Sequence, residues 1–302
     1  FLNYAIILKD LGKAEDAIKL ILRAIKLKPD FTEAYANIGT LYRNISNFKK
    51  AELFTRKAIE INPKLATLYQ NLGNILYDQN KLEEAEEITR KAMMMNPNLA
   101  DVYITLGNVL QDLNKFEEAE EVINQVIKIN PYFADAYLIL GNIHQSNGKL
   151  KQAEINFLRA FELNPNSFDS LFNLSLIQMF QGNYKSGLKN YESRFKRNDP
   201  IIPHAQPQIP RWLGELPKEG EILLIITEQG LGDTLHFMRY IPCLREKGYE
   251  VIFCVVETLH PLIKESGIAS NLITKEQANK VSKGKYCPLL SLPLHLGVNQ
   301  NN

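Results

Sequence analysis

The stretch PKLATLYQNLGNILYDQNKLEEAEEITRKAMMMN, residues 63–96, decides the fold, because the chain repeats its pattern at a fixed interval. The proline that opens it recurs every 34 residues, at Pro29, Pro63, Pro97, Pro131 and Pro165. The same step separates the members of three further columns: Tyr35, Tyr69, Tyr103 and Tyr137; Gly39, Gly73, Gly107 and Gly141; and Ala17, Ala51, Ala85, Ala119 and Ala153. Self-similarity at a fixed period is the sequence signature of a repeat architecture.

Each unit of this pattern predicts two helices joined by a short turn. The first helix carries the tyrosine and, four residues later, the glycine; the segment DQNKLEEAE (78–86) then contains the turn. Glycine and alanine at facing positions let the two helices approach closely, and the tyrosine fills the space beside them. The proline lacks the N–H that a continuing helix needs, so it fixes the end of each unit.

The pattern resembles the tetratricopeptide repeat, and the resemblance covers roughly residues 1–200. A half unit, residues 1–31, precedes the regular units. The regular units begin at Thr32, Ala66, Ala100 and Ala134, and a fifth begins at Phe168. We therefore expect a mainly α chain, with a tetratricopeptide α-solenoid over residues 1–197.

The fifth unit departs from the pattern. Ser175 stands at the glycine position, Gly187 at the alanine position and Asp199 at the proline position. Terminal repeats are expected to be atypical, because one of their faces no longer meets a neighbour.

Asparagines on the first helices are expected to line a peptide-binding groove, since such solenoids bind extended peptides along the concave face that these helices form. One set shares a position in its units, and a second set lies three residues on, one turn along the same face. The first set is Asn3, Asn37, Asn71 and Asn173, and the second is Asn74, Asn108 and Asn142. A primary amide both donates and accepts hydrogen bonds, so such a row would hold a peptide backbone whatever its sequence.

This row is similar to the asparagine ladder of the O-linked N-acetylglucosamine transferases, which implies a protein or peptide partner in the groove. Thr105 and Ile139 interrupt the first set. The alternative interpretation is that NLGN, residues 71–74, is simply a common packing sequence in such repeats.

Composition excludes several other classes of function. Lys and Arg number 35 against 34 Asp and Glu, with no local excess of basic residues, which argues against a nucleic-acid partner. Cys243, Cys254 and Cys287 form no CxxC motif, so neither a disulfide framework nor a metal site is indicated, and a reducing cytoplasm fits. No run of 18 apolar residues exists, so no membrane span is expected.

After the repeats the pattern of the sequence changes. Residues 198–219 contain five prolines and read as an extended connector, which Trp212 is expected to pin by burial. From residue 220, the strand-like segments EILLIIT, EVIFCVV and NLIT alternate with helical ones, and YCPLLSLPLHLG has no clear assignment. Strands of this apolar kind predict a parallel sheet covered on both faces. We therefore expect a small, incomplete, Rossmann-like α/β domain over residues 220–302.

The loop EQGLGDTLHF, residues 228–237, follows the first of these strands. No GK[ST] follows its glycines, and Leu235 occupies the third position of a GxGxxG fingerprint, so a phosphate loop is disfavoured. Gly232 is expected to supply a sharp turn. Asp233 has two possible roles, as a carboxylate that stabilises the helix N-terminus or as a general base in a cleft at the sheet's carboxyl edge.

Sequence resemblance favours the second role. The segments EQGLGDTLHFMRYIPCL, GYEVIFCV and CPLLSLPLHLG resemble the N-terminal half of GT-B glycosyltransferases, especially the bacterial group fused behind tetratricopeptide repeats and, more distantly, the heptosyltransferases. NYESRF and PRWLGE resemble the join in those fused proteins. The resemblance implies that Asp233 is the catalytic base. The substrate-binding residues that it implies are Gln229, Gly230, Gly232, Thr234, His236 and Arg239.

Two functions remain open at this point. In the first, the repeats present a glycan or protein acceptor for glycosyl transfer, and the nucleotide-sugar donor binds a second half beyond Asn302, so that the fragment is inactive alone. The opening FLNYAIIL likewise suggests that the chain continues before Phe1. In the second, the protein is a non-catalytic interaction scaffold with a degenerate α/β appendage. Neither function calls for a cofactor or a metal.

Overall fold

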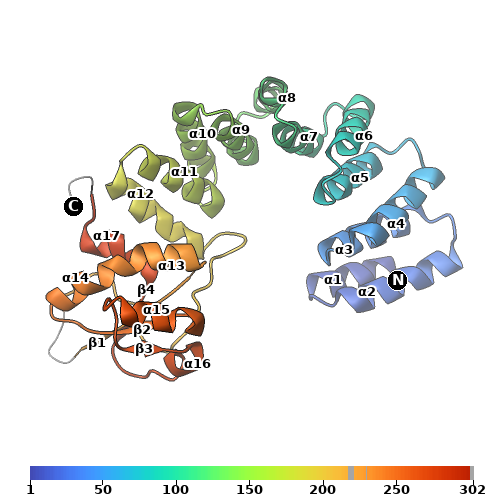
Figure 1. Cartoon of the computed structure of the whole chain (residues 1–302). Helices are drawn as coiled ribbons and strands as arrows, with labels where there is room; N and C mark the ends of the chain where they lie inside the picture. The colour runs from blue at the N-terminus through green and yellow to red at the C-terminus, as the bar shows by residue number, and fades with distance from the viewer. Residues whose placement is uncertain (217–220, 229, 300–302) are drawn as a thin grey trace. The chain divides into compact units, whose positions relative to one another are not determined.

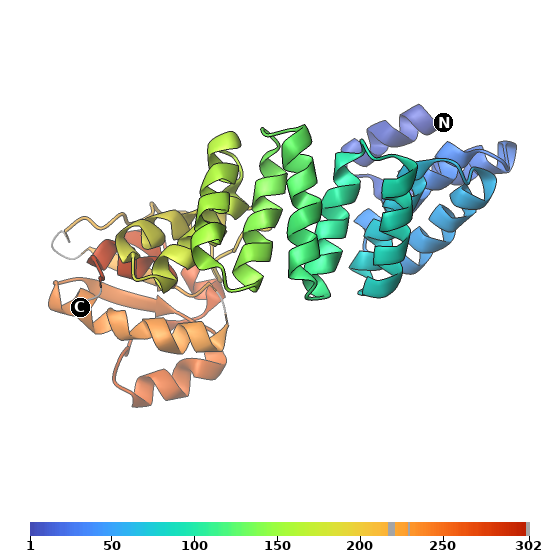
Figure 2. The ribbon, with the colours of Figure 1, turned by 90° about the horizontal axis from the view of Figure 1, so that it is seen from above.

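The computed structural model describes residues 1–216, 221–228 and 230–299, apart from the side chains of Asn3, Lys9 and Asp10. The chain forms two compact units, Phe1–Leu163 and Asn164–Asn302. The first unit consists of helix pairs that lie side by side (Figures 1 and 2). The second contains one further helix pair, followed by a parallel sheet with the helices that connect its strands.

The helices of the first unit follow the predicted period. Its first helices are α1 (Leu2–Asp10), α3 (Thr32–Asn44), α5 (Ala66–Asp78), α7 (Ala100–Asp112) and α9 (Ala134–Ser146). Its second helices are α2 (Ala14–Leu27), α4 (Phe48–Ile61), α6 (Leu82–Met95), α8 (Phe116–Ile129) and α10 (Leu150–Leu163). The four regular first helices begin at the residues that the 34-residue period predicts.

Close approach within each pair explains the glycine column. A Cβ on Gly39 would lie 2.4 Å from the Thr55 Oγ1 atom, and one on Gly141 would lie 2.5 Å from the Phe157 ring. Three members of the tyrosine column, Tyr69, Tyr103 and Tyr137, donate hydrogen bonds from their hydroxyls to the carbonyls of Pro63, Pro97 and Pro131, at 3.1, 2.9 and 3.2 Å. Core packing therefore accounts for both columns.

The turn inside each pair has a left-handed residue at a fixed position. Ser46, Asn80 and Asn114 have φ of 58–59°, and Gly148 at the same position has φ of 70°. Such a residue ends a helix by turning its carbonyls toward the following N–H groups. The period thus extends to backbone conformation, although the residue type varies.

Neighbouring repeats are joined by ion pairs between their second helices. Arg56 on α4 pairs with Glu52 on its own helix and with Glu84 on α6, and Arg90 repeats the arrangement with Glu86 and Glu118. These pairs are partly exposed, so each contributes modestly to stability. They join α4 to α6 and α6 to α8.

The second unit begins with the atypical fifth repeat, formed by α11 (Phe168–Phe180), α12 (Tyr184–Tyr191) and the 3-10 helix η1 (Glu192–Phe195). In the regular units the glycine lies on the first helix, whereas in this unit it lies on the second helix, α12. Ser175 is fully buried on α11, and a Cβ on Gly187 would lie 2.6 Å from the Met179 Cγ atom and 3.1 Å from the Ser175 carbonyl oxygen. Ser175 and Gly187 together thus preserve the close approach that one glycine provides elsewhere.

A four-stranded parallel sheet forms the rest of this unit, in the order β3-β2-β1-β4. Its strands are β1 (Ile222–Ile226), β2 (Glu250–Cys254), β3 (Leu272–Ile273) and β4 (Lys285–Pro288). The intervening helices are α13 (Leu231–Phe237), η2 (Met238–Tyr240), α14 (Ile241–Glu246), η3 (Glu257–Leu259), α15 (His260–Glu265), α16 (Lys275–Ala278), η4 (Leu289–Ser291) and α17 (Leu292–Leu296). The predicted parallel sheet is confirmed, and the segment without a clear assignment forms β4, η4 and α17.

Both faces of the sheet are covered. Leu223 and Ile225 point into a core that contains Ile241, Ile263 and the side chain of Trp212. The alternate residues Leu224 and Ile226 face the other way, onto Ala205 and Ile209 of the proline-rich segment. The segment expected to be an extended connector thus contributes side chains to the cores on both faces of the sheet.

The proline-rich segment is also hydrogen-bonded to β4. Tyr286 N donates to the Pro210 carbonyl at 3.0 Å, and Trp212 N donates to the Tyr286 carbonyl at 2.8 Å. Trp212 is 2% exposed and its indole N–H donates to the Glu215 carbonyl. Within the described ranges, no helix is long and apolar enough to cross a membrane.

Candidate functional site

A single stripe of each regular first helix is left uncovered by packing, and these stripes together form what we call the inner face. The stripe on α3 contains Glu33, Ala36, Asn37, Thr40, Arg43 and Asn44, and residues at the same positions recur on α5, α7 and α9. Successive first helices lie against one another, α3 against α5, α5 against α7 and α7 against α9. Figure 1 shows them on the inside of the curve of this unit.

The predicted groove asparagines of the first unit lie on this face. Asn37, Asn71, Asn74, Asn108 and Asn142 are all partly exposed there. The amides of Asn37, Asn71 and Asn108 hydrogen-bond to no other described residue. These three amides are therefore available to a ligand.

The remaining predicted groove residues lie elsewhere. Asn173 is partly exposed on α11, in the second unit, and Asn3 lies in α1 with its side chain outside the described atoms. Thr105, which interrupts the asparagine column, donates a hydrogen bond of 2.7 Å to the Oδ1 atom of Asn74. The interruption is thus a link between neighbouring repeats.

The C-terminal edge of the inner face is built from contacts that recur 35 residues apart. Arg43 donates to both carboxylate oxygens of Asp78, at 2.5 and 3.3 Å, and Gln111 donates to the Ser146 hydroxyl at 2.9 Å. Between these two contacts, burial and a hydrogen bond to Asp112 raise the pKa of Tyr77. These edge groups are therefore already paired, whereas the amides of Asn37, Asn71 and Asn108 hydrogen-bond to no other described residue.

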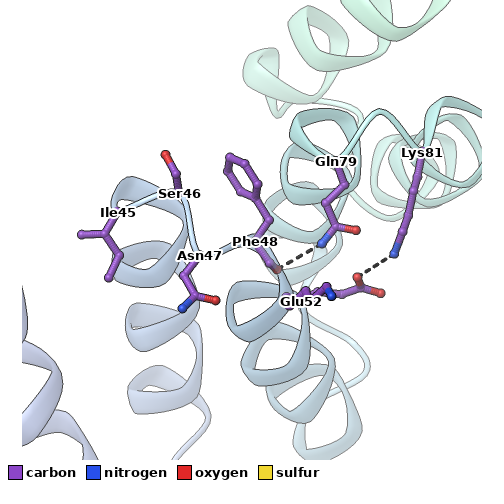
Figure 3. A pocket seen from close by; sticks show the side chains of 8 residues that line it. Ile45, Ser46, Asn47, Phe48, Glu52, Gln79 and Lys81 are labelled. Carbon is purple, nitrogen blue, oxygen red and sulfur yellow. Dashed lines mark hydrogen bonds and ion pairs between the residues drawn. The ribbon is translucent and has the colours of Figure 1, made fainter.

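Two of the cavities on the described part of the first unit adjoin α3. A small one of about 50 Å³ lies at the inner face and is lined in part by Asn37 and Thr40. A larger one of about 670 Å³ lies beside the turn between α3 and α4 (Figure 3). The small cavity therefore adjoins one of the free amides.

The polar groups of the larger cavity are occupied by structural contacts. Gln79 Nε2 donates to the Phe48 carbonyl at 3.1 Å, and Lys81 Nζ lies 2.9 Å from Glu52 Oε2 (Figure 3). Burial tends to raise the pKa of Glu52, but hydrogen bonds from Lys81 and Arg56 lower it overall. Because equivalent pairs, such as Lys115 with Glu86, recur in later repeats, this cavity belongs to the junction between repeats.

In the second unit, Asp233 lies in the first turn of α13, just beyond the carboxyl end of β1. Its carboxylate is partly buried and hydrogen-bonds to no other described residue. It is close enough to Tyr191 to help raise the pKa of that phenol, although burial is the main cause. Asp233 is thus neither part of an ion pair nor the N-cap residue, which is Gly230.

The other residues implied by the resemblance are less suited to a site. Neither Gly230 nor Gly232 has a positive φ, and a Cβ on either would meet nothing within 4 Å, so the expectation that Gly232 supplies a sharp turn is wrong. Thr234 is buried and donates back to the Gly230 carbonyl at 3.2 Å. His236 and Arg239 are exposed, and Gln229 lies outside the described residues.

Sequence reasoning missed a buried polar cluster directly before this loop. Arg194 and Glu228 have fully buried side chains and form two hydrogen bonds, of 2.7 and 3.0 Å. Arg194 also donates to Glu192 and to the Ser291 hydroxyl, both at 2.8 Å, and Arg211 donates to Glu192 and Ser291. The signal was present, since Arg194 and Arg211 lie in NYESRF and PRWLGE, segments noted only for their resemblance.

Comparison with known proteins identifies the first unit. Models of the tetratricopeptide repeat match residues 1–31, 32–65, 54–87, 76–132 and 134–167. Residues 1–167 are tetratricopeptide repeats. The predicted repeat array is thereby confirmed over this range, and no curated protein matches the chain by sequence.

Solved structures share the fold of the repeats. PilW, described as a widely conserved type IV pilus biogenesis factor, is 21% identical, with a TM-score of 0.59, over 67% of this chain and 93% of PilW. A tetratricopeptide repeat protein from Parabacteroides merdae is 16% identical, with a TM-score of 0.56, over 66% of this chain and 79% of its own. TTC0263 from Thermus thermophilus is 20% identical, with a TM-score of 0.52, over 59% of this chain and 97% of its own. At these identities the likeness concerns the fold alone.

Proposed function

We propose that this protein is an interaction scaffold whose repeats bind an extended segment of another polypeptide along the inner face. The observation that carries the proposal is the row of uncommitted amides, Asn37, Asn71 and Asn108, on successive first helices. An extended backbone presents alternating N–H and C=O groups, and a primary amide pairs with both. Recognition of this kind depends little on the side chains of the bound segment.

The test is a binding measurement on an asparagine variant. Wild-type protein is used to select binders from a library of random unstructured peptides, and affinities are then measured by calorimetry. The double variant Asn37→Ala with Asn71→Ala is expected to bind the selected peptides at least about tenfold more weakly, since each lost hydrogen bond costs about 1 kcal/mol. Asn124→Ala, a partly exposed asparagine on α8, is the matched control.

Equal affinity of the double variant and the control would refute this use of the inner face. Circular dichroism melting of each variant checks that the repeats remain folded. Because both asparagines are partly exposed and make no bonds within the described structure, their removal should leave the melting temperature nearly unchanged.

A second function is proposed for the α/β part, residues 220–302, as the acceptor-side half of a glycosyltransferase of the GT-B type. The position of Asp233 supports it, because ligands of parallel α/β sheets bind outside the carboxyl ends of the strands. A carboxylate there would take the proton of an acceptor hydroxyl as it attacks an activated sugar. The competing role, favourable interaction with the N-terminus of α13, requires no cleft.

Transfer of labelled sugar from a panel of nucleotide sugars to peptides bound by the repeats tests this second function, when it is measured on the complete protein with its donor-binding half. Asp233→Asn is expected to abolish transfer, while Glu246→Gln, an exposed carboxylate on α14, retains it. Transfer by the Asp233 variant at the wild-type rate would remove Asp233 from the mechanism. Absence of transfer from every donor by the complete wild-type protein would leave the scaffold function alone.

A further inference from the structure

The inner face is acidic although the whole chain is nearly neutral. It contains one basic side chain, Arg43, which is engaged by Asp78, and helices α3, α5, α7 and α9 contain no lysine. Its acidic side chains are Glu33, Asp78, Asp101, Asp112 and Asp135. The excess of negative charge therefore belongs to this face and not to the chain at large, whose net charge is +1.

The face changes character along its length. On α3 and α5 its centre is polar, with Asn37, Asn71 and Asn74. On α7 and α9 it carries, beside Asn108 and Asn142, the aliphatic side chains of Ile104, Leu138 and Ile139, all of them only partly buried. Of these, Ile104 and Ile139 pack against the core of the repeats. An occupant of this half would thus place an apolar side chain on an aliphatic surface.

Two carboxylates on α7 and α9 are positioned beside this aliphatic surface. Asp101 and Asp135 lie at the N-terminal end of the two stripes, one helical turn from Ile104 and Leu138, and are exposed. Neither carboxylate pairs with another described side chain, in contrast to Asp78 and Asp112 at the opposite edge. Each carboxylate also interacts favourably with the positive N-terminal end of its helix dipole. That interaction stabilises the helix whether or not a ligand is bound.

From this arrangement we infer that the occupant is a basic extended segment, with an aliphatic or aromatic residue flanked by lysine or arginine. The apolar residue packs on Ile104, Leu138 and Ile139, and the flanking cation lies beside Asp101 and Asp135. The inference rests on the proposed function, since it names the class of polypeptide that the inner face accepts. Acidic segments are disfavoured, because their carboxylates would approach a face that is already negative.

The experiment uses three peptides that differ only at the flanking positions, which are Lys, Gln or Glu around a central Leu-Phe pair. Binding to the full chain is followed by fluorescence anisotropy at low and at high salt. The Lys peptide is expected to bind more tightly than the Gln peptide by about 1.5- to 5-fold for each exposed ion pair, and the advantage should shrink at high salt. The Glu peptide is expected to bind most weakly.

Two double variants with the same change of charge locate the effect. Asp101→Asn with Asp135→Asn is expected to abolish the advantage of the Lys peptide. Glu117→Gln with Glu121→Gln, both exposed on the second helix α8, should preserve it. Asp101→Glu keeps the negative charge and should preserve the preference for the Lys peptide. This control separates the effect of the charge from any change in the structure of α7.

Failure of this inference is distinguishable from failure of the proposed function. If Lys and Gln peptides bind equally, or if the Asp101 and Asp135 variant keeps the preference, the basic occupant is refuted. In that case binding that still depends on Asn37 and Asn71 leaves the scaffold function intact. Binding that is indifferent to Asn37 and Asn71 refutes the proposed function itself.

Discussion

The guanidinium of Arg194 donates to both carboxylate oxygens of Glu228, and neither side chain is exposed to solvent. This pair joins η1, at the end of the fifth repeat, to the start of the loop that leads to Asp233. Arg194 also stacks on the rings of Tyr191 and Phe195, at 4.5 and 4.0 Å from their centroids. The fifth repeat and the sheet therefore share one buried polar centre.

Glu228→Gln should destabilise the second unit by roughly 3 kcal/mol, because it leaves the buried Arg194 without its charged partner. Trp212 reports on this unit selectively, since it is the only tryptophan of the chain and is buried against the sheet. Urea unfolding followed by Trp fluorescence measures the change, with Glu246→Gln as the exposed control. An unaltered midpoint would mean that the pair contributes nothing net to stability.

The second unit should lose stability in acid. Burial tends to raise the pKa of Glu192, but the charge of Arg194 and hydrogen bonds from Arg194 and Ser291 outweigh it, so the pKa lies below its ordinary value of 4.5. A carboxylate with a depressed folded-state pKa contributes stability above its unfolded pKa and loses it as the pH falls through the folded value. The Trp212 transition measured between pH 6 and about pH 3 should therefore move to lower urea.

Glu192→Gln tests the origin of that pH dependence. The variant should be less stable than the wild type at neutral pH and should show a smaller further loss on acidification. The same slope in both proteins would assign the acid sensitivity to other carboxylates of the second unit, such as Glu215 and Glu276, whose pKa values are also lowered.

Gly39→Ala should destabilise the helix pair α3 and α4 by about 1–3 kcal/mol, because the new methyl group would overlap the Thr55 side chain. Thr55 is β-branched and cannot easily rotate away. Adding Thr55→Ala should recover most of the loss, since it removes the atom that clashes and also a buried hydroxyl without a partner within the described structure. Thermal melting followed by circular dichroism measures both steps, and additive losses would contradict the steric explanation.

Ser46→Gly should stabilise the repeats by roughly 0.5–1 kcal/mol, because Ser46 adopts a left-handed φ of 58° that glycine tolerates better. Ser46→Ala is the control, since alanine has the same steric restriction and should give no gain. A lower melting temperature for Ser46→Gly would show that the flexibility of glycine in the unfolded chain outweighs the relief of strain.

The repeats were predictable because their information is local and periodic. Tyr69, Gly73 and Ala85 make contacts within one unit or with the next unit. The 34-residue period therefore suffices to predict where every regular first helix begins. The parallel sheet was predictable for a similar reason, since its central strands are short continuous apolar runs between helical segments.

The polar cluster was not predictable in the same way. Arg194, Glu228 and Ser291 lie far apart in the sequence and meet only when β1 and η4 are in place. A buried charged residue has no periodic signature, because its stability depends on partners that the tertiary fold supplies. The glycines of the loop led to a wrong prediction, because a local pattern was taken as a sign of strain. Gly230 and Gly232 suggest a sharp turn, yet neither has a positive φ.

The contacts between repeats have one further consequence, for the length of the protein. Each of them joins positions that are fixed within the period, so removal of residues 66–99, one period, would bring Arg43 opposite Asp112, Glu52 opposite Lys115 and Arg56 opposite Glu118. Every one of these new neighbours carries the charge of the one that it replaces. This unit can thus be lost without mismatched charges at the new boundary, so the array can shorten here while its ion pairs between repeats are kept.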